Sequence, residues 1–397
     1  MLSSPPYSLR LSSAITASPH FQIVEGRDPI LLLSGTLIRL AAACDQPGAM
    51  QDLAYFLSKP GLLRRVPHLM LFFRGPQVPL EHLTEEHLLG ALLLYDNRMI
   101  GCSTRVFTTN DRSGRNTLLA PAAQRSALAE FAARVLIDRG AHVVMISYRD
   151  EASPGESDTW TPPVSSRLKQ ISSRWARRER EIPDYLRLES TFEATLALIG
   201  KRTRNHLRYY RRRAEKELGC TFFPSVEMGR AEFLAYNRAC MYAVPDKVAA
   251  WRYDVHKELS CPLLMGIAHQ DGRWLSIVGG RRFNSNSEIL WQMNLDGLPL
   301  FSLSLVMRSF FMEHEIAQGS LRFYLEGGSS HPIRNSFVTE KLIDLAVLRR
   351  SPAALVTRKL AKHVVPSDNE LAQIFSDSEL TWRSAANSRT SAPVRIS

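Results

Sequence analysis

The sequence has little cysteine and no long hydrophobic run. Its 397 residues include five cysteines, an odd number scattered from Cys44 to Cys261 without a Cys-x-x-Cys pair. This arrangement argues against a disulfide framework and a zinc module, and it favours a reducing compartment. The most apolar early stretch, residues 30–44, contains Arg39 and is too short to span a bilayer. We therefore expect a cytoplasmic protein without an integral membrane segment.

The sequence also lacks the motifs of several common enzyme classes. It contains no Walker phosphate loop, no zincin motif and no Gly-x-Ser-x-Gly nucleophile elbow. The N-terminus has no continuous apolar core of the signal-peptide type. No metal site is expected.

What the sequence does contain is an excess of positive charge. Lys and Arg total 50 against 39 Asp and Glu, which gives a formal net charge of +11. Such an excess favours anionic partners, which include nucleic acid, a membrane surface and a phosphate-bearing cofactor such as CoA. Charge alone does not choose among these partners.

Segments rich in small and polar residues divide the chain. Trp382 begins a weakly patterned end, and Glu151–Ser166 carries three prolines and a glycine, which predict a long surface loop. The length allows two domains. The predicted organisation is a disordered N-terminus at 1–20, an N-terminal half at 21–185, a C-terminal half at 186–350, and a helical segment with a disordered tail at 351–397.

The first half shows predicted strands followed by a helix and one more strand. Apolar runs predict the strands, and an apolar face at Leu128, Phe131 and Val135 predicts the helix. In chain order the elements are a strand at Gly90–Tyr95, a turn at Asp96–Arg98, a strand at Met99–Phe107, the run Asn116–Ala120, the helix, and a strand at His142–Tyr148.

The second half repeats this order. Its elements are strands at Leu263–His269, Trp274–Phe283 and Glu288–Asn294, a helix with an apolar face from Leu303 to His314, and a strand at Leu321–Leu325. Asp96 and Asp271, Arg98 and Arg273, Phe107 and Phe283, and Gly140 and Gly319 fall at nearly constant offsets. We interpret the repeat as an internal duplication. The pair Gly279-Gly280 predicts a β-bulge in the middle strand.

A meander of antiparallel strands followed by a helix and one more strand resembles the kernel of the GNAT superfamily. The resemblance implies an α/β (α+β) fold of two GNAT-like halves, each a mixed, mostly antiparallel sheet flanked by helices. It also implies that the strands before and after the helix splay apart, so that the gap admits the pantetheine arm of acyl-CoA. The helix N-terminus would take the pyrophosphate, because its free N–H groups and dipole favour phosphate.

The most distinctive segment is a basic helix predicted at 201–218. Lys201–Arg213 contains seven Lys or Arg residues and no acid. At helical spacing, one face is an apolar stripe that includes Leu207 and Tyr210, while Arg204 and Arg208 lie on another face. Guanidinium groups on such a face bind oxyanions. The alternative is a solvated basic surface.

This helix carries a second resemblance. The stretch 185–219 is similar to the middle of acetyltransferase domains of the CelD/BcsL type, and the match lies on Arg204, Asn205, Leu207, Arg208 and Arg211. The resemblance covers roughly residues 85–345. Relatives commonly have an acidic residue before a glycine, followed by a Tyr-Lys pair. In this sequence Glu326 takes the place of the acidic residue, and Arg334 takes the place of the lysine.

Acyl transfer to an amine needs a base and a group that stabilises the developing oxyanion. Glu326 follows the last core strand, at the strand end where ligands of α/β sheets collect. His331 is the second candidate, because histidine titrates near neutral pH. The alternatives are that Glu326 caps the Gly-Gly loop and that His331 is a surface residue.

The cofactor candidates follow the third strand of the second half. They are Gln292, Asn294, Gly297 and Ser302, with Arg281 or Arg282 adding charge. Ser302 is expected to cap the helix. An ordinary strand-to-helix turn is the alternative. The substrate-binding candidates are Arg204, Arg208 and Arg334, and the basic helix is expected to face a cleft between the halves.

Three functions remain open. The favoured one is an acyltransferase that moves an acyl group from acetyl-CoA or another acyl-CoA to an amine or hydroxyl. Its acceptor would be a small molecule or glycan precursor, a sugar or amino compound of polysaccharide or envelope biosynthesis. The second is a Fem-type transferase that shares the double-GNAT architecture and uses aminoacyl-tRNA. The third is a non-catalytic, degenerate GNAT module.

Overall fold

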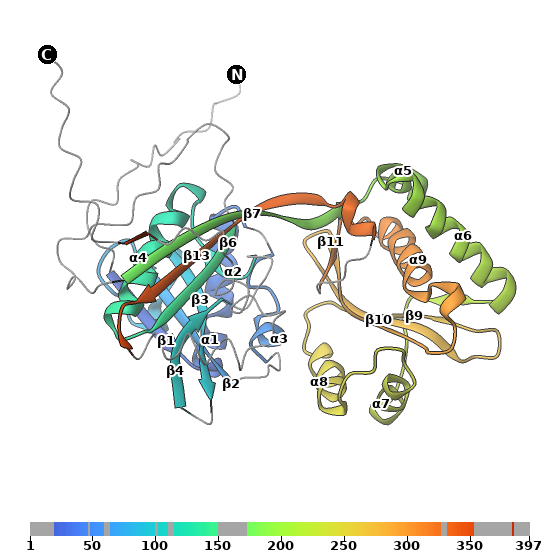
Figure 1. Cartoon of the computed structure of the whole chain (residues 1–397), viewed down its shortest axis with the longest axis horizontal. Coiled ribbons are helices and arrows are strands. Elements are labelled where there is room, and N and C mark those ends of the chain that lie inside the picture. The colour runs from blue at the N-terminus through green and yellow to red at the C-terminus, as the bar shows by residue number, and fades with distance from the viewer. Residues whose placement is uncertain are drawn as a thin grey trace, which may run out of the picture.

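The computed structural model describes residues 20–46, 48–58, 64–99, 102–109, 115–149, 173–326, 332–352 and 383–384. Figure 1 shows two lobes connected by a pair of long strands. The predicted surface loop at Glu151–Ser166, the candidate His331 and most of the predicted terminal segments lie outside the described residues.

The first lobe is a sheet with a helix between its parallel strands. Strands β1 to β4 pair antiparallel in sequence order, β4 pairs parallel with β6, and α4 connects them. The elements are β1 (His20–Glu25), α1 (Arg27–Leu32), α2 (Ser34–Ala43), α3 (Leu53–Ser58), β2 (Arg64–Phe73), β3 (Leu88–Met99), β4 (Cys102–Thr108), β5 (Leu118–Leu119), α4 (Arg125–Asp138) and β6 (Val143–Arg149).

The second lobe repeats this plan. Strands β8 to β11 pair antiparallel in order, and β11 pairs parallel with β12 across the connecting helix α9. The elements are α5 (Phe192–Leu198), α6 (Lys201–Leu218), β8 (Thr221–Phe223), α7 (Arg230–Arg238), α8 (Asp246–His256), β9 (Pro262–Ala268), β10 (Trp274–Phe283), β11 (Asn286–Asn294), α9 (Leu303–Ala317) and β12 (Arg322–Leu325). One apolar cluster packs α6 and α9 on one face of the sheet, and another packs α7 and α8 on the opposite face.

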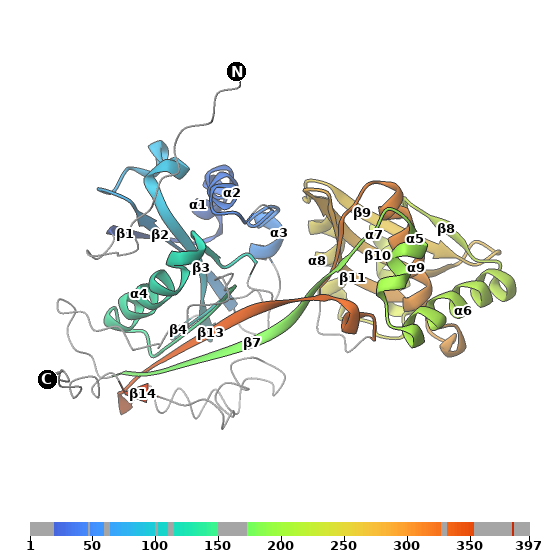
Figure 2. The ribbon, with the colours of Figure 1, turned by 90° about the horizontal axis from the view of Figure 1, so that it is seen from above.

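Two long strands, β7 (Ser173–Arg187) and β13 (Val338–Arg349), run antiparallel between the lobes. β13 also pairs with β6, and β7 pairs with β12. The last long strand of the second half therefore lies in the sheet of the first lobe, as Figure 2 shows from above. The short β14 (Arg383–Ser384) pairs with β7. The boundary predicted after residue 185 falls inside β7.

The expected fold class is confirmed. Each lobe is a mixed, mostly antiparallel sheet with flanking helices and the GNAT-like order of meander, helix and closing parallel strand. The helix predicted at 201–218 is α6, and its stripe residues Leu207, Ala214 and Leu218 are buried. Gly140 and Gly319 both follow a central helix with positive φ, 101° and 82°.

The turn predicted at Asp96–Arg98 is wrong. These residues lie inside β3, where Asp96 is buried and its carboxylate accepts hydrogen bonds from Arg98 and Ser103. Because these side chains satisfy the Asp96 carboxylate, residues that are typical of a turn adopt a strand here. Asp271, its supposed counterpart, does lie between two strands, β9 and β10. The strand that pairs with the closing strand of this lobe is accordingly β4, and not Asn116–Ala120.

The bulge expected at Gly279-Gly280 is confirmed, with its extra residue on the neighbouring strand. Gly279 pairs with Trp291 and Gly280 with Ile289, which leaves Leu290 of β11 unmatched. A Cβ on Gly279 would lie 2.0 Å from the Trp291 ring, and one on Gly280 would lie 2.2 Å from a backbone oxygen. The glycines allow Trp291 and the bulged backbone to approach β10.

Replacing Gly279 with alanine should therefore lower the stability by about 1–3 kcal/mol, because a methyl group would be forced into the Trp291 ring. The matched control is Gly75→Ala, since a Cβ on Gly75 meets nothing within 4 Å. Denaturant unfolding of the full chain measures both variants. Equal midpoints for Gly279→Ala and Gly75→Ala would contradict the close packing at the bulge.

Candidate functional site

The strands β11 and β12 part after a short paired segment. Residues 286–289 pair with residues 322–325, and the Glu326 amide donates the last hydrogen bond of the ladder to the Ile289 oxygen, at 2.8 Å. Beyond the bulge at Leu290, β12 has ended, and at the far end of β11 the Met241 amide donates to the Asn294 oxygen at 3.0 Å, next to a bridge between Cys240 and Leu295. The two strands therefore stop pairing after Ile289, and the expected gap between them under α9 stays a prediction.

The equivalent gap in the first lobe is bridged. The Thr109 amide donates to the Met145 oxygen at 3.1 Å, and the Ser147 amide donates to the Thr109 hydroxyl at 3.1 Å. The Thr117 hydroxyl donates to the Ser147 oxygen at 2.8 Å. At the first residue of α4, the buried Arg125 donates to a backbone oxygen just before the helix. These contacts fill the position in the first lobe that corresponds to the predicted gap of the second lobe.

The start of α9 has no side-chain cap. Ser302 occupies the N-cap position, but its φ of 46° and ψ of 54° are left-handed, and no hydrogen bond from its side chain caps the helix. The expected capping by Ser302 is therefore wrong, because an N-cap side chain reaches the first turn from the β region. Gly297 forms a turn before the helix with φ 82°, and a Cβ there would meet nothing within 4 Å.

Gln292 of β11 holds an arginine of α9 in the second lobe. The Arg308 Nε donates to the Gln292 Oε1 at 3.2 Å, and Gln292 is itself bonded to Ser276 and to Asn294. Arg308 is only 6% exposed, and its Nη1 is buried with no hydrogen-bond partner. Burial lowers the pKa of the Arg308 guanidinium to about 10, and the charge of Arg334 acts in the same direction. The side chain remains cationic at neutral pH.

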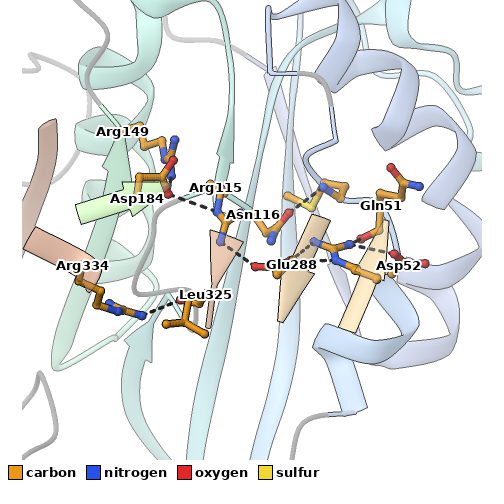
Figure 3. A network of polar contacts seen from close by, with 11 residues as sticks. Gln51, Asp52, Arg115, Asn116, Arg149, Asp184, Glu288, Leu325 and Arg334 are labelled. Atoms are coloured by element: carbon orange, nitrogen blue, oxygen red, sulfur yellow. Dashed lines mark hydrogen bonds and ion pairs between the residues drawn. The ribbon is translucent and has the colours of Figure 1, made fainter. Parts of the chain in front are cut away.

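Arg334 approaches the same region from the other side of β12. It lies on the short helix η5 (Pro332–Ser336), and its Nη2 donates to the Leu325 oxygen at 2.6 Å (Figure 3). Burial lowers the pKa of the Arg334 guanidinium, and the nearby carboxylate of Asp184 opposes the shift. Arg334 is thus held at the end of β12, and Arg308 is held by Gln292 of β11.

A row of buried charged side chains crosses between the lobes (Figure 3). Its members alternate in charge. In order they are Arg149, Asp184, Arg115, Glu288, Arg281 and Asp52. Arg115 connects the lobes through a 2.8 Å contact with Glu288, and Arg281 makes 2.9 Å contacts with both Glu288 and Asp52. We call this row the interlobe network. It is charge-balanced, with three cations and three anions.

Glu288 is the acid at the centre of the interlobe network. Burial raises the pKa of its carboxyl, and Arg115 and Arg281 together outweigh burial, so that the pKa lies below its ordinary value of 4.5. Such a carboxylate stabilises the folded state fully above the unfolded-state pKa, and its contribution is lost as the pH falls through the lower, folded-state pKa.

The unfolding midpoint should therefore fall as the pH decreases below about 4.5, the ordinary pKa of this carboxyl. A Glu288→Gln variant cannot take up this proton and should show a shallower decline over the same window. Thermal melts of the parent and the variant between neutral and acidic pH compare the slopes. Identical slopes would show that Glu288 does not contribute to the acid sensitivity.

Glu326 lies where β11 and β12 part. Burial raises the pKa of Tyr55 on α3, and the Glu326 carboxylate acts in the same direction. Burial lowers the pKa of Arg252 on α8, and Tyr55 and Glu326 oppose that shift. Glu326 therefore lies near side chains of both lobes. Gln292 and Asn294 bond to each other and to Ser276, and Gln292 also contacts Arg308 of α9.

The structure does not bring Arg281 and Arg282 to the start of α9. Arg281 belongs to the interlobe network, and Arg282 pairs with the buried Glu315 at 2.6 Å. Glu315 lies in the last turn of α9, roughly 20 Å along the helix from Ser302. Asp52 and Glu315 therefore hold the two guanidinium groups away from the start of α9.

Arg204 and Arg208 do not face a cleft between the lobes. Figures 1 and 2 show α6 on the side of the second lobe away from the first, and Arg208 pairs there with Glu193 of α5. The expected position is wrong because the apolar stripe of α6 packs on α9, which covers the outer part of the lobe.

Sequence reasoning missed Arg308 and the interlobe network. The signal for Arg308 was a lone arginine within the otherwise apolar run Leu303–Met312, of which all but Ser304 is buried. Nothing in the sequence pairs Arg115 or Asp52 with residues of the second lobe, because more than 170 positions separate each from its partner.

The sequence matches no protein-family model and no curated protein. Three solved structures are similar to it in fold. FemX shares 10% identity at a TM-score of 0.46 over 78% of this chain and 95% of its own. A tandem GNAT protein from the clavulanic acid biosynthesis pathway shares 10% identity at a TM-score of 0.44, over 84% of this chain and 99% of its own. L-PGS from Bacillus licheniformis shares 12% identity at a TM-score of 0.40, over 68% of this chain and 85% of its own.

Two searches of the described residues were negative. No helix among them combines the length and apolar character needed to cross a membrane. Nor do three or more His, Cys, Asp or Glu side chains gather there in a way that would hold a metal ion.

Proposed function

We propose that the protein is an acyltransferase that binds acyl-CoA in the gap between β11 and β12. The observation that carries the proposal is the parting of these strands under the uncapped start of α9, while the matching gap of the first lobe is bridged. Backbone N–H groups at a helix start bind phosphate. Gly297 leaves room there, and Gln292 and Asn294 are the partly exposed residues at the end of an otherwise buried β11.

Glu326 is the proposed base. It follows β12 at the point where the gap begins, so that an acceptor at this position lies beside both the carboxylate and the donor. Glu326 takes the proton from the amine or hydroxyl, the new C–N or C–O bond forms as the thioester C–S bond breaks, and the thiolate leaves and is protonated. We propose that a backbone N–H group near the bulge at Leu290 stabilises the oxyanion.

The acceptor class rests on the resemblance to the CelD/BcsL type. It supports a cytoplasmic enzyme acting on a sugar or amino compound of polysaccharide or envelope biosynthesis. Arg204 and Arg208 lie in the first half of α6, and the other end of the helix, at Arg213, reaches the start of α9. We therefore propose that Arg204 and Arg208 bind a distal part of the donor or acceptor.

An aminoacyl-tRNA donor is the second candidate, and the position of α6 favours it. Arg213 of this basic helix donates to the Leu300 oxygen at 3.3 Å and lies 4.9 Å from the centre of the Phe301 ring, beside the start of α9. A basic surface next to the gap suits a nucleic-acid donor. Titration with tRNA at physiological salt tests it, and tight binding of tRNA without binding of acyl-CoA would replace the first proposal.

The donor site is tested by calorimetric titration of acetyl-CoA into the parent and a Gly297→Trp variant. We expect the parent to bind and the variant to bind at least 10-fold more weakly, because the indole fills the space before α9. The control is Gly272→Trp, since Gly272 in the β9–β10 turn has a similar positive φ of 88° and open space around its Cβ position.

Two outcomes would contradict this placement. Equal affinity in Gly297→Trp and Gly272→Trp would place the donor elsewhere in the molecule. Failure of the parent to bind either acetyl-CoA or tRNA would favour a module without transferase activity.

A further inference from the structure

We infer that Arg308, together with Arg334, binds a carboxylate of the substrate inside the gap between β11 and β12. This inference deepens the proposed function and rests on it for the identity of the reaction. The existence of the anion site does not depend on the proposed function, because the contacts and burial of the two arginines support it directly.

Arg308 differs from the other buried arginines among the described residues. Arg281 makes 2.9 Å contacts with two carboxylates. Arg125 donates to two backbone oxygens, those of Ala120 and Arg149. The contact made by Arg308 is with the amide oxygen of Gln292, and its Nη1 has no partner although the side chain is only 6% exposed.

A buried guanidinium without a counter-ion is strongly unfavourable. Among the described residues, no carboxylate contacts Arg308. A second cation, Arg334, donates to the Leu325 oxygen at the end of β12, and its charge lowers the pKa of Arg308. An anion from a ligand would offset part of the desolvation penalty of Arg308.

The position favours a carboxylate over a phosphate. Arg308 lies roughly 9 Å along α9 from Ser302, at 1.5 Å per residue, and thus inside the gap and away from the helix start. Arg334 reaches the Leu325 oxygen at the end of β12, next to Glu326. An enclosed guanidinium that is oriented by a glutamine suits a small planar oxyanion. The carboxylate belongs either to a dicarboxylic acyl group on the donor or to an amino-acid-type acceptor.

The test compares the parent with Arg308→Met, which keeps the length and apolar stem but removes the charge. Arg238→Met is the control, because Arg238 is an exposed arginine on α7. We expect succinate, but not the neutral succinamide, to raise the melting temperature of the parent and of Arg238→Met. Arg308→Met should melt higher than the parent in chloride buffer and should not respond to succinate, because an unpaired buried charge is gone.

Two further experiments show whether the donor or the acceptor carries the carboxylate. If the donor carries it, the parent should bind succinyl-CoA at least 10-fold more tightly than acetyl-CoA, and Arg308→Met should lose this preference. If the acceptor carries it, the parent with acetyl-CoA should accept L-lysine in preference to cadaverine, and Arg308→Met should not discriminate between them.

Outcomes for this inference and for the proposed function are separable. A succinate effect that depends on Arg308, without any binding of acyl-CoA, supports the anion site and contradicts the donor assignment. Binding of acetyl-CoA by a parent that does not respond to succinate and shows no preference in either experiment overturns the anion site alone. A lower melting temperature for Arg308→Met, with the same response to succinate as the parent, would show that Arg308 is structural.

Discussion

Replacing Glu288 with glutamine is expected to lower the free energy of unfolding by about 3–5 kcal/mol, the usual cost of removing one partner from a buried ion pair. The Glu288 side chain is 2% exposed and contacts Arg281 of its own lobe and Arg115 of the other. Without its charge, the interlobe network has three buried cations and two anions. Denaturant unfolding of the full chain measures the loss.

The control for this substitution is Asp246→Asn. Asp246 also pairs with an arginine, Arg238, but both side chains are more than half exposed. Solvent screens such a pair, so its removal should leave the unfolding midpoint nearly unchanged. A Glu288→Gln variant as stable as Asp246→Asn would show that the lobes are held by apolar packing and by the β7–β13 ribbon without help from the network.

Replacing Glu326 with glutamine is expected to lower kcat by at least about 100-fold, within the range of general-base contributions, and to leave the affinity for acyl-CoA unchanged. The amide keeps the shape of the side chain and removes its ability to accept a proton. The backbone hydrogen bond from Glu326 to Ile289 does not involve the side chain and should persist. Steady-state kinetics with a responsive acceptor, together with calorimetry of acetyl-CoA, separate the two effects.

A matched variant, Glu313→Gln, removes a carboxylate from α9 that pairs at the surface with Arg211. It should retain the activity of the parent. If both variants keep full activity, the base is another group or a water chain. If Glu326→Gln loses acyl-CoA binding in parallel with kcat, Glu326 shapes the gap and does not act as a base.

Local patterns predicted elements well where a residue's neighbours in the sequence are also its neighbours in space. The basic helix follows from its apolar stripe, and Gly279-Gly280 predicted a bulge because a missing Cβ permits close backbone approach. The order of meander, helix and closing strand also predicted the parting of β11 and β12. Such patterns fail where side chains of the paired strands satisfy a polar group, as Ser103 and Arg98 do for Asp96 inside β3.

The candidate site was only partly predictable for the same physical reason. Strand order predicted the positions of Glu326, Gln292 and Asn294 at strand ends, and their roles stay predictions. Arg281 and Arg282 could not be assigned, because the acids that hold them, Asp52 and Glu315, lie on other elements. The sequence alone does not show which residue pairs with a given charged side chain.

The sequence by itself determined the repeated α/β order and the amphipathic helix at 201–218, because periodicity and chain order are local properties, whereas the expectation of a gap came from the resemblance to the GNAT superfamily. Tertiary structure alone decided that β13 enters the first sheet, that the gap of the first lobe is bridged by Thr109 and Thr117, and that Arg308 is buried without a counter-ion. Burial and ion pairing depend on which distant segments meet, and a single sequence does not record those contacts.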